Sequence, residues 1–189
     1  MQKIILASQS PRRKQLLEWA EIDFDIIVHP TDESFPADMP INEVPVHIAH
    51  NKAKAVQAMD AASHKKIIIA ADTIVVLNDK VIGKPAGRDE AIQILKSLSG
   101  KTHEVITGVV ILNNGKEISF ADTTSVEFHE LTNDQIIFYV DKYQPYDKAG
   151  AYAIQEWIGV VGIKNIAGDF YNVMGLPVSR VLQELGKMK

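Results

Sequence analysis

Cysteine is absent from the 189-residue chain, which excludes disulfide bonds, thiolate chemistry and cysteine-based zinc sites. Long apolar runs are also lacking, since no stretch approaches the roughly 20 residues needed to span a bilayer. The few apolar residues between Lys3 and Ser8 are too short a run for the core of a signal peptide. The absence of cysteine suits a reducing compartment. Since a membrane span and a signal peptide are not predicted either, we expect the protein to be cytoplasmic.

An excess of basic residues is lacking as well. With 20 Lys and Arg against 24 Asp and Glu, the formal net charge is −4, which argues against a surface built to bind nucleic acid. A local basic pocket remains compatible with this balance. Apolar residues make up 46% of the chain and charged residues 23%, close to the averages for a folded soluble domain. Because repeats and long linkers are missing, residues 1–189 predict one domain.

Strand and helix patterns alternate along the whole chain. The apolar and β-prone stretches predict strands at 3–7, 24–28, 67–77, 81–82, 102–112, 117–128 and 158–163. Helical spacing predicts helices that begin at 11, 46, 88, 132 and 177, while the proline-rich stretch 29–45 predicts a loop. Mixed elements in this order predict an α/β fold in which helices pack against a mixed sheet.

The first candidate site lies between a predicted strand and a predicted helix. Ser10 suits the N-cap of that helix, and Pro11 fits its first position. Arg12 and Arg13 follow in the first turn, where the helix dipole disfavours positive charge unless an anion is bound. Together with Ser8 and the free backbone N–H groups, they favour an oligophosphate site. The alternative is an ordinary capped helix with solvated arginines.

The second candidate interrupts the apolar stretch 67–77. A carboxylate such as Asp72 is costly to bury in a strand unless it is paired, hydrogen-bonded or bound to a metal. At a cleft, Asp72 could hold a divalent metal or orient a water molecule, and Thr73 could donate a hydrogen bond to a base or a phosphate. The alternative is an aspartate that only caps a turn or a backbone N–H group.

Other positions carry less information on their own. Lys52 and Lys84 lie beside helix and turn signals, where a lysine is most often a solvated surface charge. The segment 147–155 is rich in small residues, which allow a backbone to approach a ligand closely, and it ends at Gln155. A structural turn is its alternative. The segment 172–177 is interpreted as structural, and the six histidines show no metal-ligand spacing.

In their order along the chain, these motifs resemble the Maf family of nucleotide pyrophosphatases. The matching pieces are SQSPRR at 8–13, NKA at 51–53, ADT at 71–73, GKP at 83–85, LSG at 98–100, TGV at 107–109, DKAGAY at 147–152 and VMGLP at 173–177. They extend from near the first residue to near the last, and jointly they are specific. One departure is Asn51, where many relatives carry Glu or Gln.

The resemblance implies an α/β fold with an elongated twisted sheet and two lobes around a deep cleft, similar to inosine-triphosphate pyrophosphatases. It also implies cleavage of a nucleoside triphosphate between the α and β phosphates with a divalent cation, Mg²⁺ or Mn²⁺. Asp72 matches the family's essential acid, and Asp32-Glu33 matches an acidic pair, of which we expect Glu33 near the metal. Arg12, Thr73 and Gln155 match three positions linked to base choice, in the form found in relatives that act on dTTP and UTP.

A mechanism follows as a hypothesis. The metal bridges the triphosphate and Asp72, with Glu33 nearby, and Asp72 orients or deprotonates the water that attacks the α-phosphorus. Ser8 and backbone N–H groups hold phosphate oxygens, and Gln155 has the donor and the acceptor that a uracil or thymine edge requires. Positive charge that stabilises the departing pyrophosphate is expected from Arg12, Arg13, Lys52 and Lys84.

Two other functions stay open at this point. One is a house-cleaning hydrolase that prefers modified or purine triphosphates. The other is a non-catalytic regulator of cell division that binds nucleotide or nucleic acid, because the family has been associated with septum formation. The acidic balance and the lack of a basic, aromatic-rich stripe argue against nucleic acid. The resemblance and the frequency of symmetric dimers among soluble proteins predict a homodimer.

Overall fold

The computed structural model of the protein describes residues 3–59 and 66–188. The chain divides into two compact units, which are described separately below. Unit 1 comprises Met1–Asp72, Thr107–Asp122 and Gly175–Lys189, and unit 2 comprises Thr73–Ile106 and Thr123–Met174. Within the described residues, none of the helices has the length and apolar character needed to cross a membrane.

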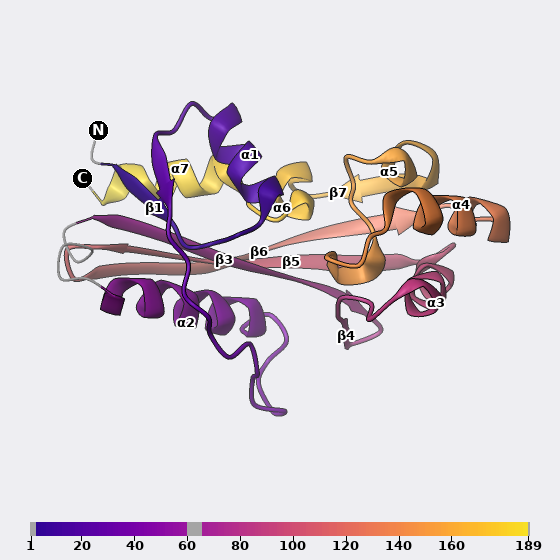
Figure 1. The fold of residues 1–189 in the computed structure, drawn as a ribbon, viewed down its shortest axis with the longest axis horizontal. Helices are drawn as coiled ribbons and strands as arrows, with labels where there is room; N and C mark the ends of the chain where they lie inside the picture. The colour runs from indigo at the N-terminus through magenta and orange to yellow at the C-terminus, as the bar shows by residue number, and fades with distance from the viewer. Residues whose placement is uncertain (1–2, 60–65, 189) are drawn as a thin grey trace. The chain divides into compact units, whose positions relative to one another are not determined.

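A seven-stranded mixed sheet is the main element of the fold (Figure 1). Its strands are β1 (Ile4–Leu6), β2 (Phe24–Ile26), β3 (Ile67–Leu77), β4 (Lys80–Ile82), β5 (Thr102–Asn113), β6 (Lys116–Phe128) and β7 (Ile163–Ala167). The strand order is β2-β1-β3-β5-β6-β7, with β4 paired to β3. Strand β1 is parallel to β2 and β3, whereas β3–β4 and β6–β7 are antiparallel. The predicted mixed α/β fold is therefore confirmed.

Helices account for most of the remaining chain. They are α1 (Pro11–Trp19), α2 (Val44–Met59), α3 (Arg88–Leu98), α4 (Asn133–Tyr143), α5 (Trp157–Gly162), α6 (Phe170–Met174), α7 (Val178–Lys187) and the 3₁₀ turn η2 (Ala149–Ala151). Strand β3 and helix α3 have the predicted bounds. Between β5 and β6, Asn114 and Gly115 adopt the positive φ angles of 47° and 82° that a tight hairpin turn requires.

In unit 1, helix α2 covers one face of the strands, and α1 and α7 cover the other (Figure 1). The small and branched side chains of α2 pack against the inward side chains of the sheet. The resulting core contains Ile5, Ala7, Ala49, Ala53, Val56, Ile68, Ala70, Val110 and Leu112. Because alanines line the helix side of this core, the α2 backbone lies close to the strands.

Close approach of α2 to β5 depends on Gly108. A Cβ atom at this position would lie 2.2 Å from the backbone nitrogen of Val46 and 2.3 Å from the carbonyl carbon of Pro45. Helix α2 begins at Val44, two residues before the prediction, and includes Pro45 in its first turn. Proline is tolerated there because the first-turn N–H groups have no partner within the helix.

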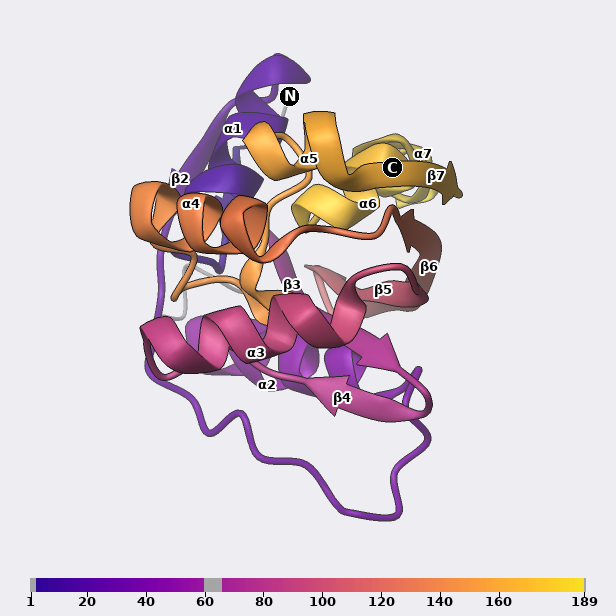
Figure 2. The same cartoon turned by 90° about the vertical axis from the view of Figure 1, so that its right-hand side faces the viewer.

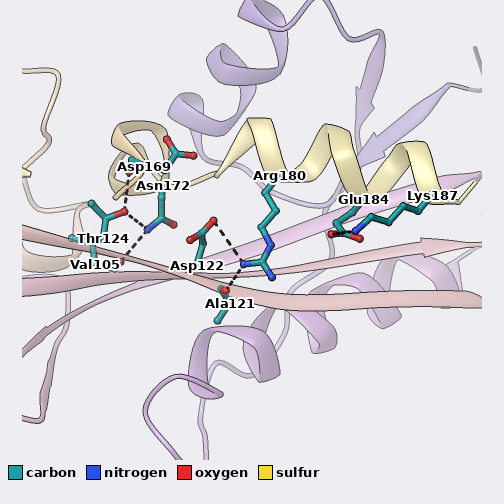
Figure 3. A network of polar contacts seen from close by, with 9 residues as sticks. All are labelled: Val105, Ala121, Asp122, Thr124, Asp169, Asn172, Arg180, Glu184 and Lys187. Carbon is teal, nitrogen blue, oxygen red and sulfur yellow. Dashed lines mark hydrogen bonds and ion pairs between the residues drawn. The ribbon is translucent and has the colours of Figure 1, made fainter. Parts of the chain in front are cut away.

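The C-terminal helix is bound to β6 through Arg180, as Figure 3 shows. The Arg180 Nη1 atom donates a hydrogen bond of 2.9 Å to the carbonyl oxygen of Ala121 and lies 3.9 Å from the carboxylate of Asp122. Its guanidinium also lies 4.2 Å from the centre of the Phe120 ring. A hydrogen bond and a cation–π contact from one side chain thus help to keep α7 on the sheet of unit 1.

In unit 2, helices α3 and α4 pack together (Figure 2). Helix α4 begins with a full capping box, in which Thr132 Oγ1 accepts from Gln135 N and the Gln135 side chain accepts from Thr132 N. Arg88 of α3 forms two hydrogen bonds with Asp141 of α4, at 2.6 and 3.0 Å. Both partners are about half exposed, so this pair adds little stability.

The strand predicted at 158–163 is wrong, because residues 157–162 form α5 and the strand β7 begins only at Ile163. Branched side chains favoured a strand in the sequence. In the structure Ile158 and Gly162 are buried, whereas Val160 is 82% exposed. Burial at every fourth position, rather than at every second, fits a helix, so tertiary packing outweighs the local preference.

The turn that follows β7 is fixed by a buried asparagine of unit 2 (Figure 3). Asn172 Nδ2 donates to the carbonyl oxygen of Val105 at 3.1 Å and to Thr124 Oγ1 at 3.0 Å. Thr124 Oγ1 in turn donates to the carbonyl oxygen of Asp169 at 2.9 Å. These contacts support the structural interpretation of the first part of segment 172–177.

Candidate functional site

A lysine between two carboxylates forms the centre of the candidate site in unit 1. The Lys52 Nζ atom lies 2.7 Å from Glu33 Oε1 and 2.7 Å from Asp72 Oδ1. The side chains of Lys52 and Asp72 are 18% and 16% exposed, whereas that of Glu33 is 51% exposed. The structure therefore brings together three residues that lie far apart in the sequence, at a place that solvent can still reach.

The local sequence explains how Lys52 and Asp72 meet. The buried face of α2 includes Ile48, Ala49 and Ala53, and Lys52 lies one turn after Ile48 on the same side of the helix. Asp72 follows the buried residues Ala70 and Ala71 within β3. A charged side chain inside an apolar helical stripe is costly to bury without a partner, and the Asp72 carboxylate is that partner.

Arg13 is buried at the start of α1 and belongs to the same unit. Its Nε atom donates to the carbonyl oxygen of Gly175 at 2.7 Å, and its Nη1 atom donates to Ser8 Oγ at 3.0 Å. Burial lowers the pKa of Arg13, while the charges of Asp72 and Glu33 raise it and the charge of Arg12 lowers it. The charge of Arg13 therefore interacts with both carboxylates that contact Lys52.

Segment 172–177 also contributes a structural contact to the site. The carbonyl oxygen of Gly175 accepts the hydrogen bond that orients Arg13. Gly175 has a φ of 117°, a backbone conformation that side-chain-bearing residues rarely adopt. The glycine therefore allows the chain to present this carbonyl to the guanidinium.

The start of α1 has the predicted cap. Ser10 Oγ accepts a hydrogen bond of 3.5 Å from the Arg13 backbone N–H, and Pro11 is the first helical residue. The buried Ser8 Oγ accepts a second bond of 3.2 Å from Ser10 N. Arg12 is only partly buried. In unit 1, three cationic residues (Arg12, Arg13 and Lys52) thus accompany two carboxylates (Glu33 and Asp72), an excess of positive charge that favours a polyanion.

The remaining predicted site residues lie in unit 2. Thr73 is partly buried and directly follows Asp72 in β3. Lys84 is exposed after β4, next to Gly83, whose carbonyl oxygen accepts a hydrogen bond of 3.2 Å from Gly150 N. Gln155 is also exposed. The hydrogen bond between Gly150 and Gly83 brings the chain at Lys84 next to η2. The segment η2 precedes Gln155 in the chain.

A second charged cluster includes Glu156, the residue that follows Gln155. The Nζ atom of the buried Lys148 lies 2.8 Å from Asp147 Oδ1 and 3.6 Å from Glu156 Oε1. The Tyr139 hydroxyl donates a hydrogen bond to Glu156 Oε2. Neither Tyr139 nor Glu156 carries a distinct signal in the sequence, since a tyrosine in the apolar stripe of a helix is normally a core residue.

A buried group of aromatic rings connects segment 147–155 to strand β5. His103 Nε2 lies 2.7 Å from the Tyr152 hydroxyl, and both rings pack edge-on against Phe128. Burial lowers the pKa of His103 to about 4 and raises the pKa of Tyr152, so both side chains are neutral at pH 7. Their hydrogen bond joins β5 to the residue that follows η2.

Comparison with solved structures defines the class of fold. The chain is similar to the structure of the Staphylococcus aureus Ham1 protein, with a TM-score of 0.56 and 17% sequence identity over 99% of this chain and 100% of that one. At this level of identity, the likeness shows a shared fold.

Sequence comparison then identifies the family. The chain belongs to the Maf family, because residues 3–188 match the description of a Maf-like protein. It is 48% identical to a dTTP/UTP pyrophosphatase of Bacteroides thetaiotaomicron, over 98% of this chain and 96% of the relative. It is 52% identical to a protein of the same name from Cytophaga hutchinsonii, over 98% and 84%. The resemblance predicted from the motifs is confirmed.

Proposed function

We propose that this protein is a nucleoside triphosphate pyrophosphatase that hydrolyses dTTP and UTP to the monophosphate and pyrophosphate. The single observation that supports it most is Lys52 between Asp72 and Glu33, close to the buried Arg13, in a chain of the Maf family. Relatives at 43–52% identity that are named dTTP/UTP pyrophosphatase support the substrate class.

Asp72 is the proposed base of the reaction. It orients a water molecule and accepts its proton while the oxygen attacks the α-phosphorus. The bond between the α-phosphorus and the bridging oxygen then breaks, and that oxygen leaves with pyrophosphate. The proposed charge stabilisation comes from Arg12, Arg13 and Lys52 in unit 1 and from Lys84 in unit 2. Because Lys52 is already bonded to Asp72, it also keeps the carboxylate in one orientation.

We propose that Asp72 and Glu33 hold a divalent cation, Mg²⁺ or Mn²⁺. The carboxylates of Asp72 and Glu33 lie close to each other, since each contacts the Lys52 Nζ atom at 2.7 Å. Within residues 3–59 and 66–188, three or more His, Cys, Asp or Glu side chains nowhere form a group that could hold a metal. Two carboxylates plus phosphate oxygens and water are a suitable ligand set for Mg²⁺. Such a cation would neutralise phosphate charge and lower the pKa of a bound water.

Base choice is proposed to depend on Arg12, Thr73 and Gln155. The exposed Gln155 amide offers one donor and one acceptor, which match the N3–H group and a carbonyl oxygen of uracil or thymine. A cytosine edge presents an acceptor where uracil presents the N3–H donor. A fixed amide therefore discriminates between the two bases, because the wrong base leaves a polar group without its partner.

The wider context of the enzyme is part of the same proposal. We expect residues 1–189 to act as a single domain in the cytoplasm and to form a homodimer. Size-exclusion chromatography with light scattering tests the dimer, which predicts about twice the chain mass of 20.9 kDa.

A nucleotide panel tests the proposed activity. Purified protein is assayed for pyrophosphate release from dTTP, UTP, CTP, GTP, ATP and modified pyrimidine triphosphates, with Mg²⁺, with Mn²⁺ and with a chelator. We expect dTTP and UTP to be preferred and the chelator to abolish release. Asp72→Asn keeps the side-chain shape and loses the charge, so it should reduce turnover by at least about a hundredfold. Asp79→Asn, in the exposed β3–β4 turn, is the matched control. Near-normal turnover of Asp72→Asn at saturating metal would exclude Asp72 as the base.

A further inference from the structure

We propose that Tyr139 is a positioning residue for base selection, because its hydroxyl holds the chain on both sides of Gln155. This inference rests on the proposed function, in which Gln155 contacts the base. Tyr139 lies on α4, and its side chain is fully buried. Figure 2 shows α4 together with α5, which begins directly after Glu156.

One oxygen atom makes both contacts. The Tyr139 hydroxyl accepts a hydrogen bond of 3.1 Å from the Ala153 backbone N–H and donates one to the Glu156 carboxylate. The backbone between these residues also closes on itself, since Glu156 N donates to the Ala153 carbonyl oxygen at 3.1 Å. Gln155 lies inside this turn. Its backbone position is therefore determined by contacts immediately before and after it.

The chain that leads to Gln155 differs from Gln155 itself in its exposure to solvent. Residues 150–154 are buried, whereas Gln155 is exposed. The Ile154 carbonyl oxygen packs so closely on Gly159 of α5 that a Cβ atom there would lie 1.7 Å away. An amide carried on an immobilised backbone starts from one position, so fewer of its conformations can reach the edge of a wrongly paired base.

The Glu156 carboxylate extends the arrangement to a second residue. Its Oε2 atom accepts from Tyr139, and its Oε1 atom lies 3.6 Å from the Nζ atom of the buried Lys148. Asp147 shares the same ammonium at 2.8 Å. Glu156 therefore connects the Tyr139 hydroxyl to the start of the segment that leads to Gln155, and both ends of this segment depend on one carboxylate.

Removal of the hydroxyl should loosen the turn without removing any residue that contacts the substrate. In Tyr139→Phe, the Ala153 N–H and one carboxylate oxygen of Glu156 lose their shared partner while the ring remains in the core. The amide of Gln155 would then adapt to a wrong base. We expect the ratio of kcat/KM for UTP over CTP to fall by about tenfold, which corresponds to about 1.4 kcal/mol of discrimination.

The experiment compares four proteins: the wild type, Tyr139→Phe, Tyr143→Phe and Gln155→Ala. Tyr143 is the matched control, because it stacks on Tyr139 with 5.0 Å between ring centres and also loses one hydroxyl from α4. Each protein is assayed with UTP, dTTP and CTP, and inhibition by tripolyphosphate, which carries no base, is measured alongside. Thermal unfolding records any loss of stability.

A lower UTP over CTP ratio in Tyr139→Phe, with unchanged tripolyphosphate inhibition and an unchanged ratio in Tyr143→Phe, supports the inference. A merely structural role would change stability or all substrates together and leave the ratio intact, and that result overturns it. If Gln155→Ala also leaves the ratio intact, the proposed base contact itself fails. If Gln155→Ala lowers the ratio and Tyr139→Phe does not, only the positioning role is refuted.

Discussion

Replacement of His103 by glutamine should remove an acid-sensitive part of the stability of the protein. His103 is 2% exposed, and its Nε2 atom lies 2.7 Å from the Tyr152 hydroxyl. Its Nδ1 atom has no hydrogen-bond partner among the described residues. A proton on this ring would add a charge in an apolar environment, which is why burial lowers the pKa of His103 from 6.5 to about 4.

The sign and the size of the effect follow from this shift. Between pH 6.5 and about 4 the unfolded chain binds a proton at this histidine and the folded chain does not. The free energy of unfolding is therefore unaffected by this group above pH 6.5 and decreases as the pH falls through that window. From the two pKa values, the loss is about 2 kcal/mol at pH 5 and about 3 kcal/mol at pH 4.

Urea unfolding at pH 7 and at pH 5 measures this loss. His103→Gln keeps a polar atom for the Tyr152 hydroxyl and removes the titration, so its free energy of unfolding should fall about 2 kcal/mol less between the two pH values than that of the wild type. His29→Gln is the matched control, because it makes the same substitution at an exposed position. Equal pH dependence of the wild type and His103→Gln would refute the reasoning.

Two further predictions concern packing and capping. Gly108→Ala would place a Cβ atom 2.2 Å from the Val46 nitrogen, so we expect a loss of about 3 kcal/mol or more in urea unfolding, whereas Gly115→Ala in the open β5–β6 turn should cost only the strain of its positive φ. Thr132→Ala removes the side-chain half of the α4 capping box and should cost about 1 kcal/mol, while Thr132→Ser should retain most of it. An unchanged midpoint in Gly108→Ala, or equal losses in the two Thr132 variants, would contradict these assignments.

Local chemistry made much of the fold predictable. Ser10 and Pro11 mark the start of α1, and Asn114 with Gly115 marks the β5–β6 turn, because caps and tight turns are determined by neighbouring residues. Helix α5 was not predictable in this way. Its apolar residues favour a strand locally. The helix becomes evident only from the burial of Ile158 and the exposure of Val160 in the folded protein.

The candidate site was likewise only partly predictable from the sequence. The oligophosphate motif at the start of α1 and Asp72 in an apolar strand are visible in the sequence, because each conflicts with its local environment unless a partner is present. The contacts of Lys52 with Glu33 and Asp72 depend on packing between α2, β3 and the loop before α2, so spacing alone does not reveal them. The apolar stripe that contains Lys52 was the available signal.

Tyr139 and Glu156 illustrate the limit of motif-based prediction. Neither breaks a local rule, since Tyr139 occupies a core position of α4 and Glu156 an ordinary position before α5. Their importance comes from a hydrogen bond over 17 positions of sequence separation. Such contacts become visible only once the chain has folded.

The position of bond cleavage tests the central claim most directly. UTP is hydrolysed by the wild-type protein in water enriched in ¹⁸O, and the products are separated and weighed by mass spectrometry. Attack on the α-phosphorus predicts one ¹⁸O atom in UMP and none in the released pyrophosphate. Label in pyrophosphate, or the formation of UDP and labelled phosphate, would contradict the proposed reaction.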